Sequence, residues 1–142
     1  MKYLKLSLVI VWMIIIFMFS NQKADESTEL SDGVILKVVR IVEKINHKSY
    51  SDEEILNKFF VPVRKIAHFT IYLILGILVY LYIKEYGFNN TCLISIMICC
   101  MYACSDEIHQ IFVDGRSGEV LDVIIDTIGS IIGIFITKLI KD

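Results

Sequence analysis

The chain has 142 residues, of which 56% are hydrophobic and 21% charged, and its formal net charge is -2. This apolar content exceeds that of an ordinary soluble domain and predicts a single domain embedded in a membrane. The weak negative charge, together with the lack of zinc-finger, helix-turn-helix or aromatic RNA-binding motifs, excludes nucleic acid as a partner.

The first predicted element is a membrane span over residues 4–20, most of which are apolar. Lys5 can extend from the start of this span toward the headgroups, as long basic side chains do at helix ends. A signal peptide is the alternative, because Lys2 and Lys5 precede a short apolar run. No small-x-small cleavage site follows at residues 20–23, which favours a span that is retained.

A loop over residues 21–65 follows, and it is too polar to enter the membrane. Residues 34–45 repeat apolar side chains at helical spacing with charged side chains opposite. This pattern predicts an amphipathic helix that either lies in the headgroup region or packs on the bundle. The tetrapeptide Ser-Asp-Glu-Glu at 51–54 has the form of a capping box, and we expect a second short helix there that Pro62 ends.

Three more spans are predicted, over residues 66–84, 91–111 and 119–140. The first of these begins with 18 residues that carry no formal charge, enough to cross a hydrocarbon core about 30 Å thick. The other two carry charged residues where they approach each other in the sequence. The predicted fold class is therefore an all-α, multi-pass bundle of four transmembrane helices that forms one domain over residues 1–142.

The distribution of lysine and arginine favours an orientation with both termini in the cytoplasm. In that orientation the lysines near both ends of the chain lie inside, whereas the basic residues Arg64, Lys65 and Arg116 flank spans outside. We therefore expect the loop 21–65 and the turn 114–118 to face the exterior of the cell.

The four cysteines lie in the third span and form neither a Cys-x-x-Cys pair nor part of two matching clusters. Free cysteine behaves as a small buried hydrophobic residue, so we expect packing residues rather than zinc ligands. His-Glu-x-x-His spacing is absent as well. The sequence therefore predicts no metal ion and no cofactor. The cysteines are Cys92, Cys99, Cys100 and Cys104.

Charged residues of the last hairpin are expected to lie at matching depths in the membrane. With residues 114–118 as the turn, Asp106 and Asp126 are each eight residues away, about 12 Å deep at 1.5 Å per residue. By the same count, Gln110 and Asp122 each lie about 6 Å deep, at matching levels. The second span begins on the same side of the membrane, which brings its basic start into the same leaflet.

An uncompensated carboxylate within the bilayer costs about 2.5 to 3.5 kcal/mol on insertion scales, so we expect these acids to be paired. A structural ion-pair network that fixes helix register is the alternative to a binding or chemical site. The candidate residues of the site are Arg64, Lys65, His68, Asp106, Glu107, His109, Gln110, Arg116, Asp122 and Asp126. The residues expected to let the helices pack closely are Tyr72, Gly76, Gly129 and Gly133.

Several motifs occur in a fixed order along the chain. They are Arg64-Lys65-x-Ala67-His68-Phe69, Tyr72-x-x-Leu75-Gly76, Ser105-Asp106-Glu107-x-His109-Gln110-x-Phe112-Val113-x-Gly115-Arg116, and Asp122-x-x-x-Asp126-Thr127-x-Gly129 with Gly133. In order and spacing they resemble the VanZ-like membrane proteins, and Phe19-Ser20-x-Gln22 resembles the stretch after that family's first span. The chain departs from the family at Ile71, where members often have Glu, and at Asp114, where they often have Pro. The first departure removes one expected acid from the second span.

The resemblance implies a small multi-spanning protein of the bacterial cell membrane. The family takes its name from a member associated with low-level resistance to teicoplanin, a lipoglycopeptide antibiotic, and the resemblance supplies no active site. We expect a non-enzymatic cell-envelope factor that affects glycopeptide susceptibility through an outer-leaflet polar pocket. Membrane lipids are its expected partners, and its ligand would be a lipid headgroup, a cell-wall precursor or a lipoglycopeptide.

Two alternatives stay open on the sequence. In one, paired carboxylates and a histidine perform acid/base chemistry within the membrane on a lipid-linked or cell-wall precursor. In the other, Asp106, His109 and Asp126 bind a cation or relay protons, and a pore of four short spans would then require oligomerisation.

Overall fold

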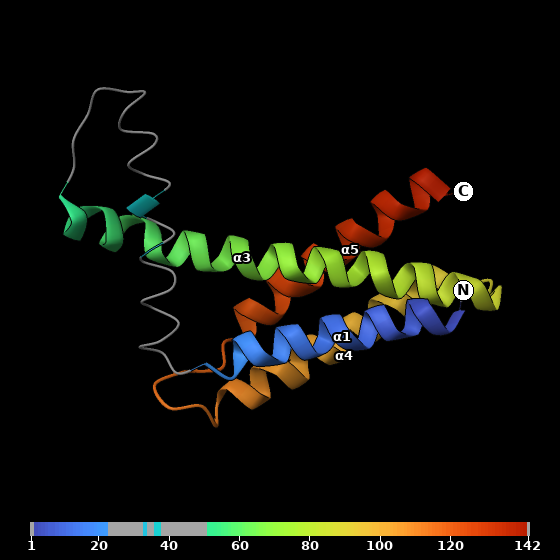
Figure 1. Ribbon diagram of the computed structural model, residues 1–142, viewed down its shortest axis with the longest axis horizontal. Coiled ribbons are helices and arrows are strands. Elements are labelled where there is room, and N and C mark those ends of the chain that lie inside the picture. Colours follow the sequence, from blue (N-terminus) through green and yellow to red (C-terminus); the bar gives the residue numbers. More distant parts are fainter. Residues whose placement is uncertain (1, 23–32, 34–35, 38–50, 142) are drawn as a thin grey trace.

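The computed structural model of the chain describes residues 2–22, 33, 36–37 and 51–141. All regular elements among these residues are helical (Figure 1). The elements are α1 at Lys2–Ser20, α3 at Asp52–Ile83, the short 3-10 helix η1 at Lys84–Tyr86, α4 at Thr91–Gln110 and α5 at Val120–Lys141. The prediction of an all-α bundle is confirmed.

Among the residues that the structure describes, four segments are long and apolar enough to cross a membrane, by length and composition. Their boundaries lie within four residues of the predicted ones, and the chain is a multi-pass membrane protein. The predicted amphipathic helix over 34–45 lies outside the described residues except at 36 and 37, which are helical. The four candidate spans are Lys2–Ser20, Pro62–Tyr86, Thr91–Gln110 and Val120–Lys141.

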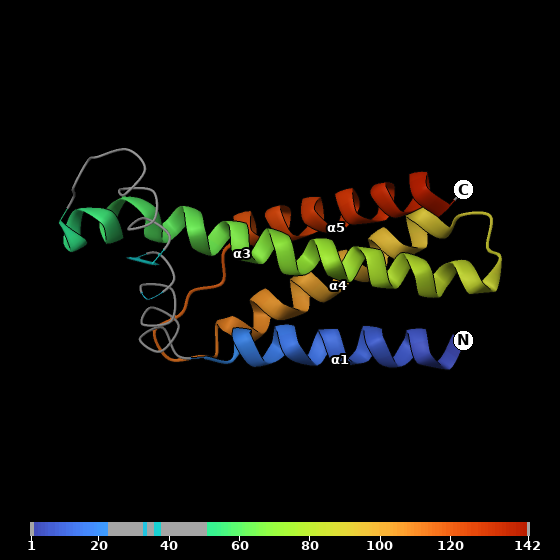
Figure 2. The ribbon, with the colours of Figure 1, turned by 45° about the horizontal axis from the view of Figure 1, so that its top comes forward.

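The helices run alternately in opposite directions along the bundle (Figure 2). Both ends of the chain therefore lie at one end of the bundle, where Lys5 forms an ion pair with Glu85. The end of α1, the start of the second crossing and the loop between α4 and α5 lie toward the opposite end. This places the basic start of the second crossing on the same side as the α4–α5 loop, as the sequence predicted.

The prediction that Pro62 ends a separate short helix is wrong. α3 begins at Asp52, as the capping tetrapeptide predicted, and the backbone N–H of Ile55 donates to the carbonyl of Ser51 at 3.1 Å. The helix then continues through Pro62 for a total of 32 residues. Proline removes only one backbone hydrogen bond, and the apolar run after it has to be helical because lipid offers its backbone no other partners.

The contact between α3 and α5 is the most extensive in the bundle, and it depends on glycine. A Cβ added to Gly76 would lie 2.2 Å from the carbonyl oxygen of Ser130, and one added to Gly133 would lie 2.1 Å from that of Leu73. Only residues without a side chain allow the two backbones to approach this closely. The hydroxyl of Ser130 also donates to the carbonyl of Tyr72 at 3.1 Å. Small residues therefore allow α3 and α5 to pack closely.

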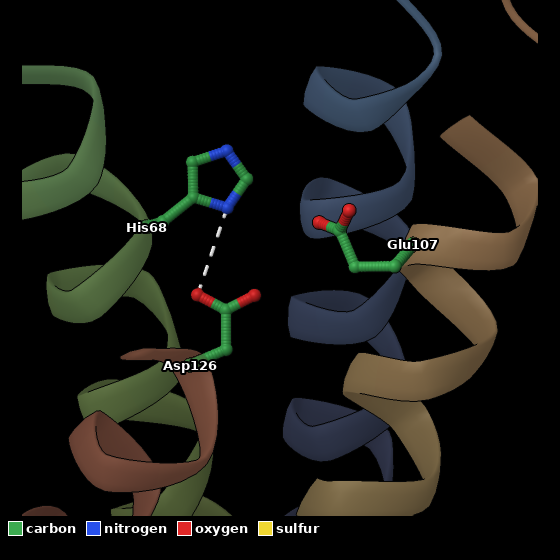
Figure 3. Close-up of side chains that lie close together, drawn as sticks. All are labelled: His68, Glu107 and Asp126. Carbon is green, nitrogen blue, oxygen red and sulfur yellow. Dashed lines mark ion pairs between the residues drawn. The ribbon is translucent and has the colours of Figure 1, made fainter. Parts of the chain in front are cut away.

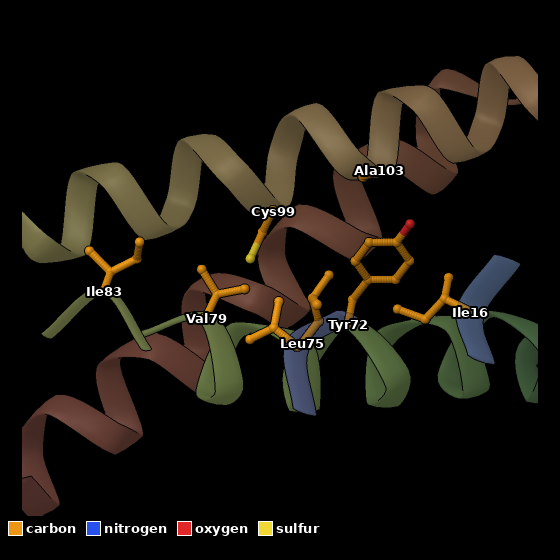
Figure 4. Close-up of a cluster of buried hydrophobic side chains, with 8 residues drawn as sticks. Ile16, Tyr72, Leu75, Val79, Ile83, Cys99 and Ala103 are labelled. Carbon is orange, nitrogen blue, oxygen red and sulfur yellow. The ribbon is translucent and has the colours of Figure 1, made fainter. Parts of the chain in front are cut away.

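An apolar cluster in the middle of the bundle joins α1, α3 and α4 (Figure 4). Its buried members are Val9, Ile16, Tyr72, Leu75, Val79, Ile83, Cys99 and Ala103. Cys99 thus packs in the core, as predicted. Two aromatic side chains hold α1 in place. The indole of Trp12 donates to the carbonyl of Ile71 at 2.8 Å, and the hydroxyl of Tyr102 donates to the carbonyl of Met13 at 2.6 Å.

Candidate functional site

Polar side chains from three helices meet near the end of the bundle opposite the chain termini. His68 of α3, Glu107 of α4 and Asp126 of α5 point toward one another (Figure 3). One potential ligand atom of each lies within 4.8 Å of those of the other two. Glu107 and Asp126 are buried, and the side chain of His68 is 14% exposed. We call these three residues the central trio.

Asp126 is the acid of the site with the fewest hydrogen-bond partners among the described residues. Its side chain is fully buried, and its Oδ1 lies 3.6 Å from Nδ1 of His68. That separation is too long for a hydrogen bond, although it allows an ion pair when the imidazole is protonated. Among the described residues, both carboxylate oxygens of Asp126 and Nδ1 of His68 lack a hydrogen-bond partner. Such groups are rare in proteins because burying them without a partner is unfavourable.

Glu107 is held in place by two hydrogen bonds. Its Oε2 accepts from the backbone N–H of Glu119 at 2.9 Å, and its Oε1 accepts from the side-chain amide of Gln110 at 3.0 Å. The α4–α5 loop approaches so closely that a Cβ at Gly118 would lie 2.7 Å from the Glu107 carbonyl oxygen. Sequence reasoning missed Gly118 and the Glu119 N–H, and the Gly-x-x-Gly spacing around Arg116 was the only signal for them.

Asp106 and Gln110 adjoin the central trio on α4. The amide of Gln110, which is fully buried, also donates weakly to Oδ2 of Asp106 at 3.4 Å. Asp106 also interacts electrostatically with Asp126. Gln110 hydrogen-bonds to acids of its own helix, whereas Asp122 pairs with Lys65 of α3.

Lys65 compensates the acids at the start of α5. Its ammonium forms an ion pair with the buried Asp122 and lies 3.5 Å from Oε2 of the more exposed Glu119. The predicted compensation of hairpin acids by the basic start of the second span therefore occurs at this pair. It also ties α3 to the loop that carries the Glu119 N–H.

Arg116 lies in the α4–α5 loop, after a turn at Gly115 whose φ of 76° favours glycine. Its guanidinium donates to the side-chain oxygen of Gln110 at 3.3 Å and to the carbonyl of Phe19 at 3.4 Å. Burial and then the neighbouring positive charge of Arg64 lower the pKa of Arg116. The guanidinium of Arg116 thus has only neutral acceptors among the described residues.

His109, a predicted member of the polar network, lies outside the central trio. Its Nε2 is 3.2 Å from the side-chain oxygen of Asn21, and its ring lies 4.5 Å from that of Phe17. Successive helical residues differ by about 100° in direction, so His109 points away from the side that Glu107 presents to the trio. The structure thus selects His68 rather than His109 as the histidine beside the acids.

The site combines two kinds of chemistry. The central trio offers one imidazole and two carboxylates, which are donor types that bind divalent cations. The adjoining guanidiniums of Arg64 and Arg116 suit carboxylate or phosphate groups. Both sets lie near the same end of the bundle.

The comparison with known families agrees with this arrangement of motifs. The VanZ/LLP1 family model matches residues 5–141, which is nearly the whole chain. No curated protein and no solved structure matches the chain. The resemblance that the motifs of α3, α4 and α5 indicated is thus confirmed, and the chain belongs to the VanZ/LLP1 family.

Proposed function

We propose that the protein is a non-enzymatic factor of the bacterial cell envelope that binds the anionic headgroup of a lipid or lipid-linked cell-wall precursor. Binding takes place in the outer leaflet, with both termini of the chain in the cytoplasm, and it changes susceptibility to lipoglycopeptides such as teicoplanin. Family membership supports the envelope context. The single observation that carries the proposal is the guanidinium of Arg116, which donates only to neutral oxygens and whose buried Nε has no partner among the described residues.

The two guanidiniums have unused capacity to bind an anion. Among the described residues, neither Arg64 nor Arg116 forms a direct salt bridge with a carboxylate. Arg116 donates only to neutral oxygens, and its buried Nε has no partner there. An anion at Arg116 would use this free donor, and the planar fork of arginine matches the oxygens of a phosphate.

A second candidate function is acid/base chemistry on the same class of lipid-linked substrate. The observation that favours it is the buried carboxylate of Asp126, which lies 3.6 Å from the imidazole of His68. A general base must keep a lone pair free within reach of a proton, and this carboxylate meets that requirement. Formation of a product from the substrate would distinguish the enzyme from the binding factor.

A binding titration tests the anion site directly. The purified protein in nonionic detergent is titrated with short-chain phosphatidylglycerol and, for comparison, with phosphatidylcholine of the same chain length. We expect Arg116→Gln to weaken phosphatidylglycerol binding about tenfold or more, the value of one charge-assisted hydrogen bond. Lys138→Gln, which removes an exposed charge at the opposite end of the bundle, is the matched control and should bind like the wild type. Equal affinities for Arg116→Gln and the wild type would contradict the assignment.

The cellular role is tested in a teicoplanin-susceptible bacterium that expresses the chain. Wild type and Lys138→Gln should raise the inhibitory concentration of teicoplanin, whereas Arg116→Gln at the same membrane level should not. Membranes from the same cells, incubated with a radiolabelled lipid-linked precursor, should release no product. A product that depends on Asp126 would favour the second candidate instead.

A further inference from the structure

We infer that the central trio of His68, Glu107 and Asp126 binds a divalent transition-metal ion, for which zinc is the best match. This inference revises the sequence-based expectation of no metal. It stands on the geometry of the trio and does not depend on the proposed binding of an anionic headgroup.

The donor set fits zinc in both chemistry and charge. Zinc sites commonly use three protein ligands drawn from histidine and acidic residues and leave a fourth position for water or another molecule. The two carboxylates of the central trio, together with a neutral imidazole, balance the charge of a divalent ion. Charge balance matters here because Glu107 and Asp126 are buried, where an unpaired charge is strongly unfavourable.

The distances suit two ligands of one ion better than they suit a hydrogen bond. Two atoms that each lie about 2.1 Å from a tetrahedral ion are about 3.4 Å apart. Nδ1 of His68 and Oδ1 of Asp126 are 3.6 Å apart, and the potential ligand atom of Glu107 lies within 4.8 Å of both. Figure 3 shows all three side chains directed at the space between them.

The unpartnered atoms provide an independent indication of a ligand. Nδ1 of His68 and both oxygens of Asp126 are buried without a hydrogen-bond partner among the described residues. A bound cation would accept lone pairs from each of these residues at once. An unsatisfied buried group in a folded protein calls for such an explanation, whether an ion or a water molecule.

The surroundings of Glu107 resemble the outer shell of a metal site. The Gln110 amide and the Glu119 N–H each donate to one carboxylate oxygen, which fixes the orientation of the group. Each oxygen keeps a second lone pair that can bind the ion. Metal-binding carboxylates are usually oriented by hydrogen bonds of this kind.

Metal content measures the proposed site directly. The full chain, purified in detergent, is equilibrated with zinc, passed through a size-exclusion column and analysed by mass spectrometry for metal. We expect about one zinc ion per wild-type chain and, in a chelator competition, at least about tenfold weaker binding by Asp126→Asn and by His68→Gln. A wild-type content below about 0.1 ion per chain would overturn the assignment, as would undiminished binding in both variants.

Matched controls separate the trio from other acids and histidines. His109→Gln removes a histidine that lies close in the sequence but contacts Asn21 and Phe17 instead. Glu85→Gln removes an exposed carboxylate at the opposite end of the bundle. Both variants should bind zinc like the wild type, and a loss of binding in either one equal to that in Asp126→Asn would overturn the assignment.

X-ray absorption distinguishes the trio from the cysteines of α4. The zinc edge of the loaded protein should show only nitrogen and oxygen ligands at about 2.0–2.2 Å, whereas sulfur ligands at about 2.3 Å would overturn the assignment. A thermal measurement on the wild type covers the case in which Asp126→Asn does not fold. Zinc should raise the unfolding midpoint of the wild type more than magnesium does, and an unchanged midpoint would contradict the site.

Discussion

Gly129→Ala should open the candidate site without altering any of its polar side chains. Gly129 lies three residues after Asp126 on α5, and an added Cβ would lie 2.5 Å from the carbonyl oxygen of Phe69 on α3. Ordinary contact begins at 3.4 Å, so the two helices must separate by about 0.9 Å there. Phe69 is the neighbour of His68, and the separation therefore acts on the pair of His68 and Asp126.

The structure sets the size of two effects of Gly129→Ala, the loss of stability and the loss of zinc affinity. The clash is with backbone, which no rotation of a side chain can relieve, and overpacking of this kind costs about 1–3 kcal/mol. For a chain of this length, each kcal/mol lowers the unfolding midpoint by about 4 °C. The wider spacing also moves His68 and Asp126 beyond their present 3.6 Å, so zinc affinity should fall about ten- to hundredfold. Thermal unfolding by circular dichroism and zinc competition in the same detergent measure the two quantities.

Gly33→Ala is the matched control, because a Cβ there meets no atom within 4 Å. It should leave the unfolding midpoint and the zinc affinity close to those of the wild type. If Gly129→Ala behaves like Gly33→Ala in both measurements, the close contact of α3 and α5 does not position the site and the reasoning is refuted.

Three further substitutions probe the supports of the site. Lys65→Met leaves the buried Asp122 unpaired and should destabilise the protein by about 1.5–3 kcal/mol in thermal unfolding, with recovery in Lys65→Met/Asp122→Asn. Gly118→Ala displaces the loop that donates to Glu107 and should weaken zinc binding about tenfold in the competition assay, while unfolding changes little. Ser130→Ala removes the side-chain hydrogen bonds to the carbonyls of Tyr72 and Asp126 and should cost about 0.6 kcal/mol by the same unfolding measurement.

Each of these expectations has an outcome that contradicts it. An equal loss in the single and double variants of Lys65 would show that the ion pair does not compensate the acid. Wild-type zinc affinity in Gly118→Ala would show that the loop does not orient Glu107. A cost for Ser130→Ala comparable to that of Gly129→Ala would assign the α3–α5 contact to hydrogen bonds rather than to close backbone packing.

The four crossings and the common level of the polar groups could be predicted from the sequence. Length and apolar content determine where a helix can cross a membrane, and counting residues from the turn gives depth at a fixed rise per residue. The same count placed Asp106 and Asp126 at one level. The glycines of α5 marked the face that approaches another helix closely, because small residues alone permit that approach.

The rotation of each helix about its axis could not be predicted in the same way. Depth alone does not decide whether Glu107 or Asp106 faces Asp126, nor which histidine joins them. His68 reaches Asp126 because the glycine contacts set how α3 lies against α5, which is a property of two helices together. Pro62 was misread for a related reason, since the local preference of proline to end a helix was outweighed by the backbone requirements of the span that follows.

The central claim is that acids from α4 and α5 are brought together within one polar site, and cysteine cross-linking in native membranes measures this most directly. Glu107→Cys and Asp126→Cys are combined in a chain whose four native cysteines are replaced by alanine, and a short bifunctional thiol reagent is added. The account predicts a link between the α4 and α5 peptides within one chain, detected by mass spectrometry, and none for the control pair Glu107→Cys and Lys138→Cys. Absence of the first link, or equal linkage in both pairs, would contradict the account.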